Sequence, residues 1–331
     1  PMSKVIVMTS ATVLAYLLGY YLRYEKKNFP NVGASLLFLS SLLVGASLFL
    51  VTQIYHFNAN THGIILIWLI LLLPFLYTVR NYAVATLFTI GFYIWLFMFL
   101  QETFLVGKYN QHDQFLLVDV YFLTTLMMIS IGTLHKTIPL INNVGKAIKW
   151  ISLQVAMIML FILTFYDVLD SMQREFGDYL LPSSGLQFIS ILFAIAAVLL
   201  ATASWISSQK GIQRSLELYG IIAGTFLITL LSRYYGDATL YSILFNFLIF
   251  AISLGIIYTG YQREDIKVVN LGIFWISALI IARYFDFFWD MLDTSVFFLL
   301  GGAILIIGAI FMERARRNLK RKFNNNNITN E

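Results

Sequence analysis

A group of charged side chains interrupts the apolar C-terminal part of the chain, in the segment IARYFDFFWDML at 281–292. Arg283, Asp286 and Asp290 are spaced i, i+3 and i+7, so on a helix they share one face, where Arg283 can pair with either carboxylate. Ionisable groups inside a membrane often mark a binding site or an ion path. Tyr284 and the other aromatic residues also fit an aromatic belt at headgroup depth. A site and a salt bridge within such a belt therefore both stay open.

Two other stretches carry candidate charges. Arg233 and Asp237 belong to RYYGD, which repeats the Arg-Tyr-aromatic pattern of the C-terminal segment. Asp119 lies about one helical turn inside an otherwise apolar segment, and an ionisable group within a span is a functional hypothesis by default. A carboxylate near the membrane surface costs much less than the roughly 3 kcal/mol quoted for a helix centre. A structural role for Asp119 therefore stays open as well.

The stretch QIYH adds a histidine at the end of an apolar segment. Gln53, Tyr55 and His56 form this group, and an imidazole can pass a proton near neutral pH or bind a metal ion. His56 and His62 do not have the spacing of zinc motifs, so we predict no cofactor and leave the question of a metal open. A helix cap or a packing role is the alternative. All of these candidates map to one predicted side of the membrane, which favours a single outward-facing polar cluster.

The elements that must position these side chains are membrane-spanning helices. Of the 331 residues, 59% are hydrophobic and 12% are charged, whereas soluble domains carry about 25% charged residues. Apolar runs of the ~20 residues that cross a bilayer as a helix recur from end to end. We therefore predict an all-α fold, a polytopic transmembrane helical bundle, with one domain over 1–322 and a disordered Asn-rich tail at 323–331. About eleven spans are predicted, at 4–22, 34–55, 63–79, 82–100, 115–134, 149–168, 186–206, 217–234, 239–260, 268–289 and 295–313.

The distribution of charge predicts the orientation of these spans. Most of the 22 Lys and Arg residues fall in loops on the same side as the C-terminus. Because positive charge is retained in the cytoplasm, we predict a bacterial cytoplasmic membrane protein with a cytoplasmic C-terminus and an outer first residue. A first residue on the outer side, combined with an odd number of spans, also leads us to expect a natural span ahead of residue 1. The basic residues lie beside spans, so we predict no nucleic acid partner, and the basic tail is expected to meet anionic lipid headgroups.

The last four predicted spans form two similar helical hairpins. Residues 229–264 and 279–315 both pass through Arg-Tyr-aromatic and an Asp, then follow a Gly-containing helix to a cluster of Arg and Glu. Two units of the same orientation indicate that a helical hairpin was duplicated. An inverted repeat, as found in many transporters, would relate units of opposite orientation, and the sequence shows none. We therefore expect a bundle built partly from repeated hairpins.

The sequence lacks the motifs of common enzymes. It contains no Cys, which excludes disulfides and thiolate chemistry. It also has no nucleophile elbow, no His-Glu-x-x-His motif and no phosphate loop. An enzyme is therefore the less supported class, and a membrane-embedded transferase that uses His56 and the Asp residues ranks last among our hypotheses.

Two motifs carry a resemblance to a known family. The Q-x-Y-H stretch leads into an apolar span ending at Arg80, and R-Y-F-D opens a last hairpin closed by E-R-x-R-R. In these motifs the chain resembles a bacterial family of predicted polytopic membrane proteins known only as a domain of unknown function. The resemblance implies the fold, additional N-terminal sequence and no particular activity. Residues 58–62 depart from the Gly-Asp variant of the family, which weakens a carboxylate-dependent role there. The matching residues are Gln53, Tyr55, His56, Arg283, Tyr284, Phe285, Asp286, Glu313, Arg314, Arg316 and Arg317.

Our leading functional hypothesis is transport or binding of a small solute, an ion or a lipid headgroup at the outer polar cluster. Arg283 and Arg233 would contact an anion, whereas Asp286, Asp290 and Asp119 would handle protons or cations. The alternative is a membrane sensor or assembly scaffold that does not transport. The sequence makes no prediction about protein partners or the oligomeric state.

Overall fold

The computed structural model describes residues 2–55, 61–102, 114–176, 183–209, 237–262, 264–288 and scattered positions between 296 and 318. Nearly all of these residues are helical, and no strand occurs among them, as the predicted all-α fold requires. The chain divides into two compact units, which are considered separately. Unit 1 comprises 1–159 and 171–236, and unit 2 comprises 160–170 and 237–331.

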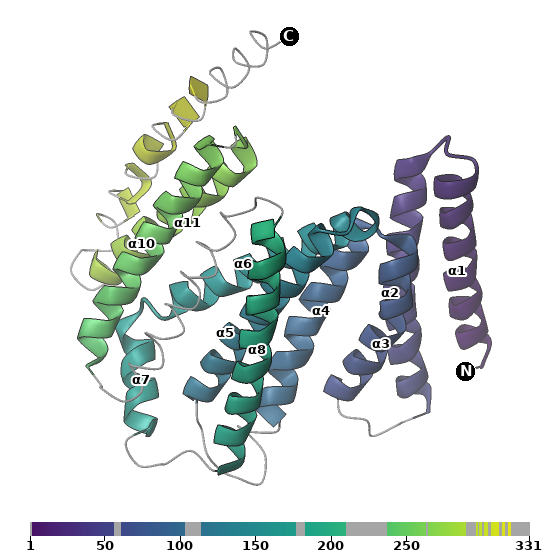
Figure 1. Ribbon diagram of the computed structural model, residues 1–331, viewed down its shortest axis with the longest axis horizontal. Helices are drawn as coiled ribbons and strands as arrows, with labels where there is room; N and C mark the ends of the chain where they lie inside the picture. Colours follow the sequence, from purple (N-terminus) through teal and green to yellow (C-terminus); the bar gives the residue numbers. More distant parts are fainter. Residues whose placement is uncertain are drawn as a thin grey trace. The chain divides into compact units, whose positions relative to one another are not determined.

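Unit 1 begins with two helical hairpins, which Figure 1 shows as neighbouring pairs of helices at the N-terminal end of the chain. The first pair is α1 (Met2–Tyr20), extended by a π-helical turn at Tyr21–Glu25, and α2 (Pro30–Ile54). The second pair is α3 (Thr61–Val79) and α4 (Tyr82–Leu100). Unit 1 also contains α5 (Gln114–Lys136), most of α6 (Asn142–Ile162), the end of α7 (Tyr166–Phe176) and α8 (Ser183–Gln209).

Unit 2 is built around a third hairpin. Helices α10 (Ala238–Gln262) and α11 (Ile266–Phe288) lie side by side. The unit also takes in the last residues of α6 and the first turns of α7 (Tyr166–Phe176). The described residues of α7 divide into two faces. Leu169 and Met172 are buried, whereas Asp167 is exposed. This charged, amphipathic helix is suited to an interface rather than to a crossing of the membrane.

The three hairpins turn in the same way. The turn from one helix to the next contains a residue with positive φ: Lys27 (56°), Arg80 (48°) and Glu264 (53°). Left-handed backbone of this kind is a common way to end a helix, although glycine is the usual residue there. The following helix is then capped in two of the hairpins. Asn81 accepts a hydrogen bond from the N–H of Ala83, and Asp265 accepts one from Lys267.

Glycine contacts hold paired helices close together. In the first hairpin a Cβ atom on Gly33 would lie 2.7 Å from the carbonyl oxygen of Gly19. Between α5 and α6 a Cβ atom on Gly145 would lie 2.5 Å from the carbonyl oxygen of Gly132. Small residues of this kind let helix backbones approach each other inside a membrane, where the hydrophobic effect does not drive helix association.

Eight described helices are long and apolar enough to cross a membrane. They match eight of the eleven predicted spans, and α8 covers a ninth. The predicted span 217–234 lies outside the described residues, and 295–313 is described only in part. The proposed duplication of the last two hairpins depends on both of these segments, so it stays a prediction.

One predicted span has the wrong limits. The segment 149–168 was expected to be a single helix, but α6 covers 142–162 and the chain leaves the helix at 163–165. The helix starts earlier because Val144, Ala147 and Ile148 form an apolar face that packs on Leu76 and Ala85. It ends earlier because donors from another helix satisfy the backbone at the break, as described next.

Candidate functional site

A polar cluster in unit 2 surrounds Arg283 on α11. Its Nη1 donates to Oδ2 of Asp286 at 2.6 Å, and its Nη2 donates to Oγ1 of Thr164 at 3.1 Å. The guanidinium carbon lies 4.6 Å from the ring centroid of Phe165, close enough for a cation–π interaction. The ion pair that the i, i+3 spacing predicted is therefore present. The contacts with Thr164 and Phe165 hold the guanidinium against the segment that joins α6 to α7.

The break between α6 and α7 creates the other half of this cluster. The carbonyl oxygen of Thr164 accepts hydrogen bonds from Oγ of Ser242 at 2.7 Å and from Nδ2 of Asn246 at 3.0 Å. Ser242 and Asn246 are four residues apart on α10, so they present their side chains on the same face. Thr164 is fully buried, and its hydroxyl donates to the carbonyl oxygen of Phe161 at 2.7 Å. Polar groups of α10 thus replace the helical partners that the break removes.

Two polar atoms of the cluster have hydrogen-bonding capacity to spare. Nε of Arg283 and Oδ1 of Asn246 are buried and make no hydrogen bond with any described residue. A guanidinium has five N–H donors, and the bonds to Asp286 and Thr164 use two of them. The ion pair is also partly open, since the side chains of Arg283 and Asp286 are 31% and 44% exposed. The cluster therefore has hydrogen-bonding capacity that none of the described residues uses.

Two other predicted site residues of unit 2 have local structural contacts. Asp237 caps α10, because its Oδ1 accepts from the N–H groups of Thr239 at 3.0 Å and Leu240 at 3.3 Å. Tyr284 packs on Gly301, where an added Cβ atom would lie 2.9 Å from the tyrosine ring. The cap accounts for Asp237 without a ligand, and the ring contact accounts for the position of Tyr284.

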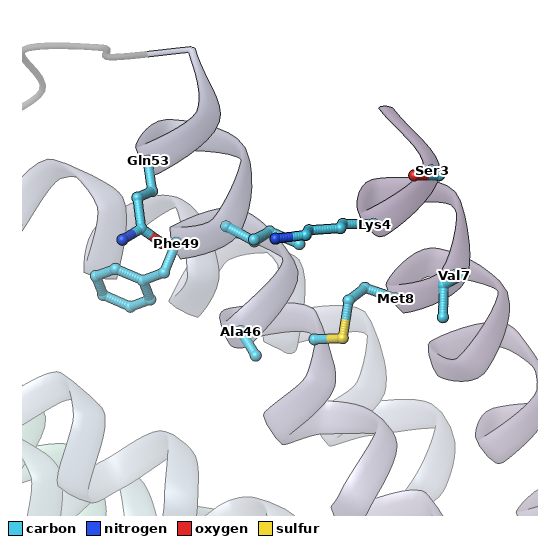
Figure 2. Close-up of a pocket in the computed structure, with 8 residues that line it drawn as sticks. Ser3, Lys4, Val7, Met8, Ala46, Phe49 and Gln53 are labelled. Atoms are coloured by element: carbon cyan, nitrogen blue, oxygen red, sulfur yellow. The ribbon is translucent and has the colours of Figure 1, made fainter. Parts of the chain in front are cut away.

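The predicted site residues of unit 1 have different surroundings. Asp119 on α5 is only 1% exposed, and its neighbours Val120 and Tyr121 belong to an apolar core cluster. Gln53 and Tyr55 stand at the C-terminal end of α2, where both are exposed. Gln53 also lines a groove between α1 and α2 (Figure 2).

Three predicted site residues, His56, Arg233 and Asp290, lie outside the described part of the chain. Among the candidates that are described, only Arg283 and Asp286 form an ion pair with each other. The single outer cluster therefore stays a hypothesis, with this pair as its described part. In the regions that the structure describes, no three His, Asp or Glu side chains gather closely enough to hold a metal ion.

Sequence reasoning missed four residues of the cluster: Thr164, Phe165, Ser242 and Asn246. Asn246 offered a signal, because it is an amide in the middle of the apolar run LYSILFNFLIF, where a polar side chain is costly. It also missed a side-chain hydrogen bond in unit 1, in which Nδ1 of His62 lies 2.6 Å from Oε2 of Glu102. This pair connects the start of α3 with the residues that follow α4.

The N-terminal part of the chain is similar to a known family. Residues 1–85 match the family model described as Predicted membrane protein (DUF2157). The expected resemblance to a membrane protein family of unknown function is confirmed for this region, which includes the Q-x-Y-H stretch. The last hairpin lies beyond the matched residues. No curated protein and no solved structure matches the chain. Together with the apolar helices, the match identifies a multi-pass membrane protein.

Proposed function

We propose that the Arg283 cluster binds a small zwitterionic group, either of a free solute or of a lipid headgroup. Anionic oxygens of the ligand would meet the guanidinium of Arg283, and its cationic group would meet the carboxylate of Asp286. The observation that supports this proposal is an arginine that Thr164, Phe165 and Asp286 hold in place, whose side chain is 31% exposed and whose Nε has no hydrogen-bond partner among the described residues. Arginine is suited to this role because its planar fork can bind carboxylate or phosphate through two parallel hydrogen bonds.

The ion pair favours a zwitterion over a simple anion. A lone anion on Arg283 would face the nearby negative charge of Asp286, whose carboxylate oxygen lies 2.6 Å from the guanidinium. A ligand with both charges satisfies both side chains and leaves the net charge of the site unchanged. Such an exchange of ionic partners avoids the uncompensated charge that makes broken ion pairs costly in a low-dielectric environment.

The proposal also places the protein in a bacterial cytoplasmic membrane with its C-terminus inside, as the distribution of Lys and Arg indicates. The Arg283 cluster would then open toward the outer side. Binding is the first step of either transport or sensing. Flux of a bound solute through proteoliposomes would favour transport, and binding without flux would favour a sensor.

Binding to purified full-length chain in detergent tests the proposal. The probes are glycerophosphoethanolamine as a soluble zwitterion, phosphatidylethanolamine as its lipid counterpart, and inorganic phosphate as a simple anion. We expect one or both zwitterions to bind more tightly than phosphate by calorimetry or native mass spectrometry. Which of the two zwitterions binds distinguishes a solute site from a headgroup site.

Matched variants connect the binding to the cluster. Arg283→Gln should weaken binding of the zwitterion by about 10- to 100-fold, because a hydrogen bond to a charged group contributes about 1.5–3 kcal/mol. The control is Arg317→Gln, since Arg317 also pairs with a carboxylate, Glu313 at 2.8 Å, but on an exposed helix surface. Equal affinity of wild type and Arg283→Gln for both zwitterions, or no binding of either by wild type, would overturn the proposal.

A further inference from the structure

We infer that the groove between α1 and α2 binds one phospholipid with an anionic headgroup. The groove has a volume of about 670 Å³. It lies on two helices that are both candidate membrane spans, Ser3–Glu25 and Pro30–Ile54. Only 11% of the apolar window of the first span is buried among the described residues, so the groove lies on a surface that lipid can reach from this helix pair. This site involves neither Arg283 nor its neighbours and does not depend on the function proposed for them.

The packing of the two helices explains why the groove forms where it does. Near the turn, Gly19 and Gly33 bring the backbones into direct contact, because even a Cβ atom on Gly33 would lie 2.7 Å from the opposite carbonyl oxygen. The groove lies at the other end of the pair, between the first turns of α1 and the last turns of α2. Larger side chains such as Met8 and Phe49 stand there in place of glycine, and Ala46 contributes only a methyl group.

The lining of the groove is apolar over most of its length and polar at one end, as a lipid molecule is. Val7, Met8 and Leu50 form an apolar wall suited to an acyl chain. Lys4 and Gln53 lie at the end of the groove that is nearest the ends of the two helices. In Figure 2 the side chain of Lys4 extends from α1 toward α2 across the groove, rather than away from it. A long basic side chain can place its amine at headgroup depth while its methylene groups cover apolar surface.

The charge of Lys4 selects the headgroup. No described carboxylate pairs with Lys4, and the one acidic residue in the first 54 positions is Glu25, at the opposite end of the helix pair. An anionic phosphate group supplies the missing counter-charge, and lysine near a membrane surface attracts anionic lipid. A second copy of the chain or another apolar helix would cover the ammonium group without neutralising it, which is costly. The groove is therefore better matched to an anionic phospholipid than to a protein partner.

Photo-crosslinking and native mass spectrometry test this site with the full chain in nanodiscs. The probes are phosphatidylglycerol and phosphatidylcholine, each with a diazirine on one acyl chain. We expect phosphatidylglycerol to label residues 3–8 and 46–53 preferentially, and one such lipid to stay bound after removal from the nanodisc. Lys4→Gln should lower the preference for phosphatidylglycerol over phosphatidylcholine by about fivefold. Lys4→Arg should retain it.

A second set of variants separates a defined site from ordinary contact with lipid. Ala46→Phe fills the floor of the groove and should abolish the retained lipid. Val32→Phe adds the same ring to an exposed position near the turn of α2 and should have no effect. Lys26→Gln is the matched control for charge. Labelling spread evenly over α1 to α4 and unchanged by Lys4→Gln and Ala46→Phe would overturn the inference. So would crosslinks that join two copies of the chain through this groove.

Discussion

Two glycines on the same helix allow the packing of the third hairpin to be tested quantitatively. A Cβ atom on Gly260 of α10 would lie 2.6 Å from the backbone nitrogen of Val269 and 2.8 Å from its Cγ2 atom. A Cβ atom on Gly255, about one and a half turns earlier, would have no atom of the other described elements within 4 Å. Because backbone cannot rotate away like a flexible side chain, Gly260→Ala must push α10 and α11 apart, whereas Gly255→Ala need not.

The expected magnitudes follow from two opposing effects. Replacement of glycine by alanine in a helix interior stabilises it by up to about 1 kcal/mol; Gly255→Ala has this gain in full, whereas Gly260 lies in the last turn, where the gain is no larger. Overpacking of a close contact costs about 1–3 kcal/mol, and only Gly260→Ala incurs that cost. We therefore expect Gly260→Ala to be less stable than Gly255→Ala by about 1–3 kcal/mol.

Reversible unfolding in mixed micelles, with increasing fractions of a denaturing detergent, measures this difference. The two variants change the same residue type in the same helix, so differences in insertion or expression largely cancel. A crosslink between α10 and α11 should also form more slowly in Gly260→Ala. Equal free energies of unfolding for the two variants would refute the close contact between these helices.

Three further predictions follow from other contacts. Asp237→Ala should lower the free energy of unfolding by about 1 kcal/mol through loss of the α10 cap, and Asp237→Asn should restore most of it, as denaturant titration would report. Asn246→Leu should destabilise the break at Thr164, seen as faster hydrogen exchange at 163–166, whereas unchanged exchange would argue against this contact. Because the chain has no Cys, single cysteines at Lys26 and Gln53 report orientation, and an impermeant maleimide should label only Gln53→Cys in intact cells.

The positions of most helices could be predicted because a membrane imposes a local rule. An apolar run must satisfy its own backbone hydrogen bonds, so the run and the helix coincide. The predicted span 82–100 has the same limits as α4, and the predicted 34–55 differs from α2 by a few residues. The exception is the end of α6. Residues 160–168 contain no Gly or Pro from which the break could be predicted. The groups that stabilise the break come from α10, which is distant in the sequence.

The candidate site likewise contains one local contact that the sequence predicts and several long-range contacts that it does not. Arg283 and Asp286 are three positions apart in the sequence, so their pairing could be predicted from helical periodicity. The bond from Arg283 to Thr164 joins residues 119 positions apart, and the bond from Asn246 to Thr164 joins residues 82 positions apart. Contacts of this kind depend on tertiary packing, which a single sequence does not display. Sequence reasoning thus found the arginine but not the broken helix that positions it.

The turns of the three hairpins have a consequence for biosynthesis. Lys27, Arg80 and Glu264 adopt left-handed backbone, which costs a residue other than glycine roughly 1–2 kcal/mol. Glycine would relieve this strain, but at the first two positions it would also remove a positive charge that, in the orientation proposed above, holds the turn on the cytoplasmic side during insertion. Under that orientation, the finished protein carries a small, permanent strain at the two basic turns, Lys27 and Arg80, that guide the first two helix pairs into the bilayer. Lys27→Gly and Arg80→Gly should yield chains that are more stable once inserted but more often inserted the wrong way round.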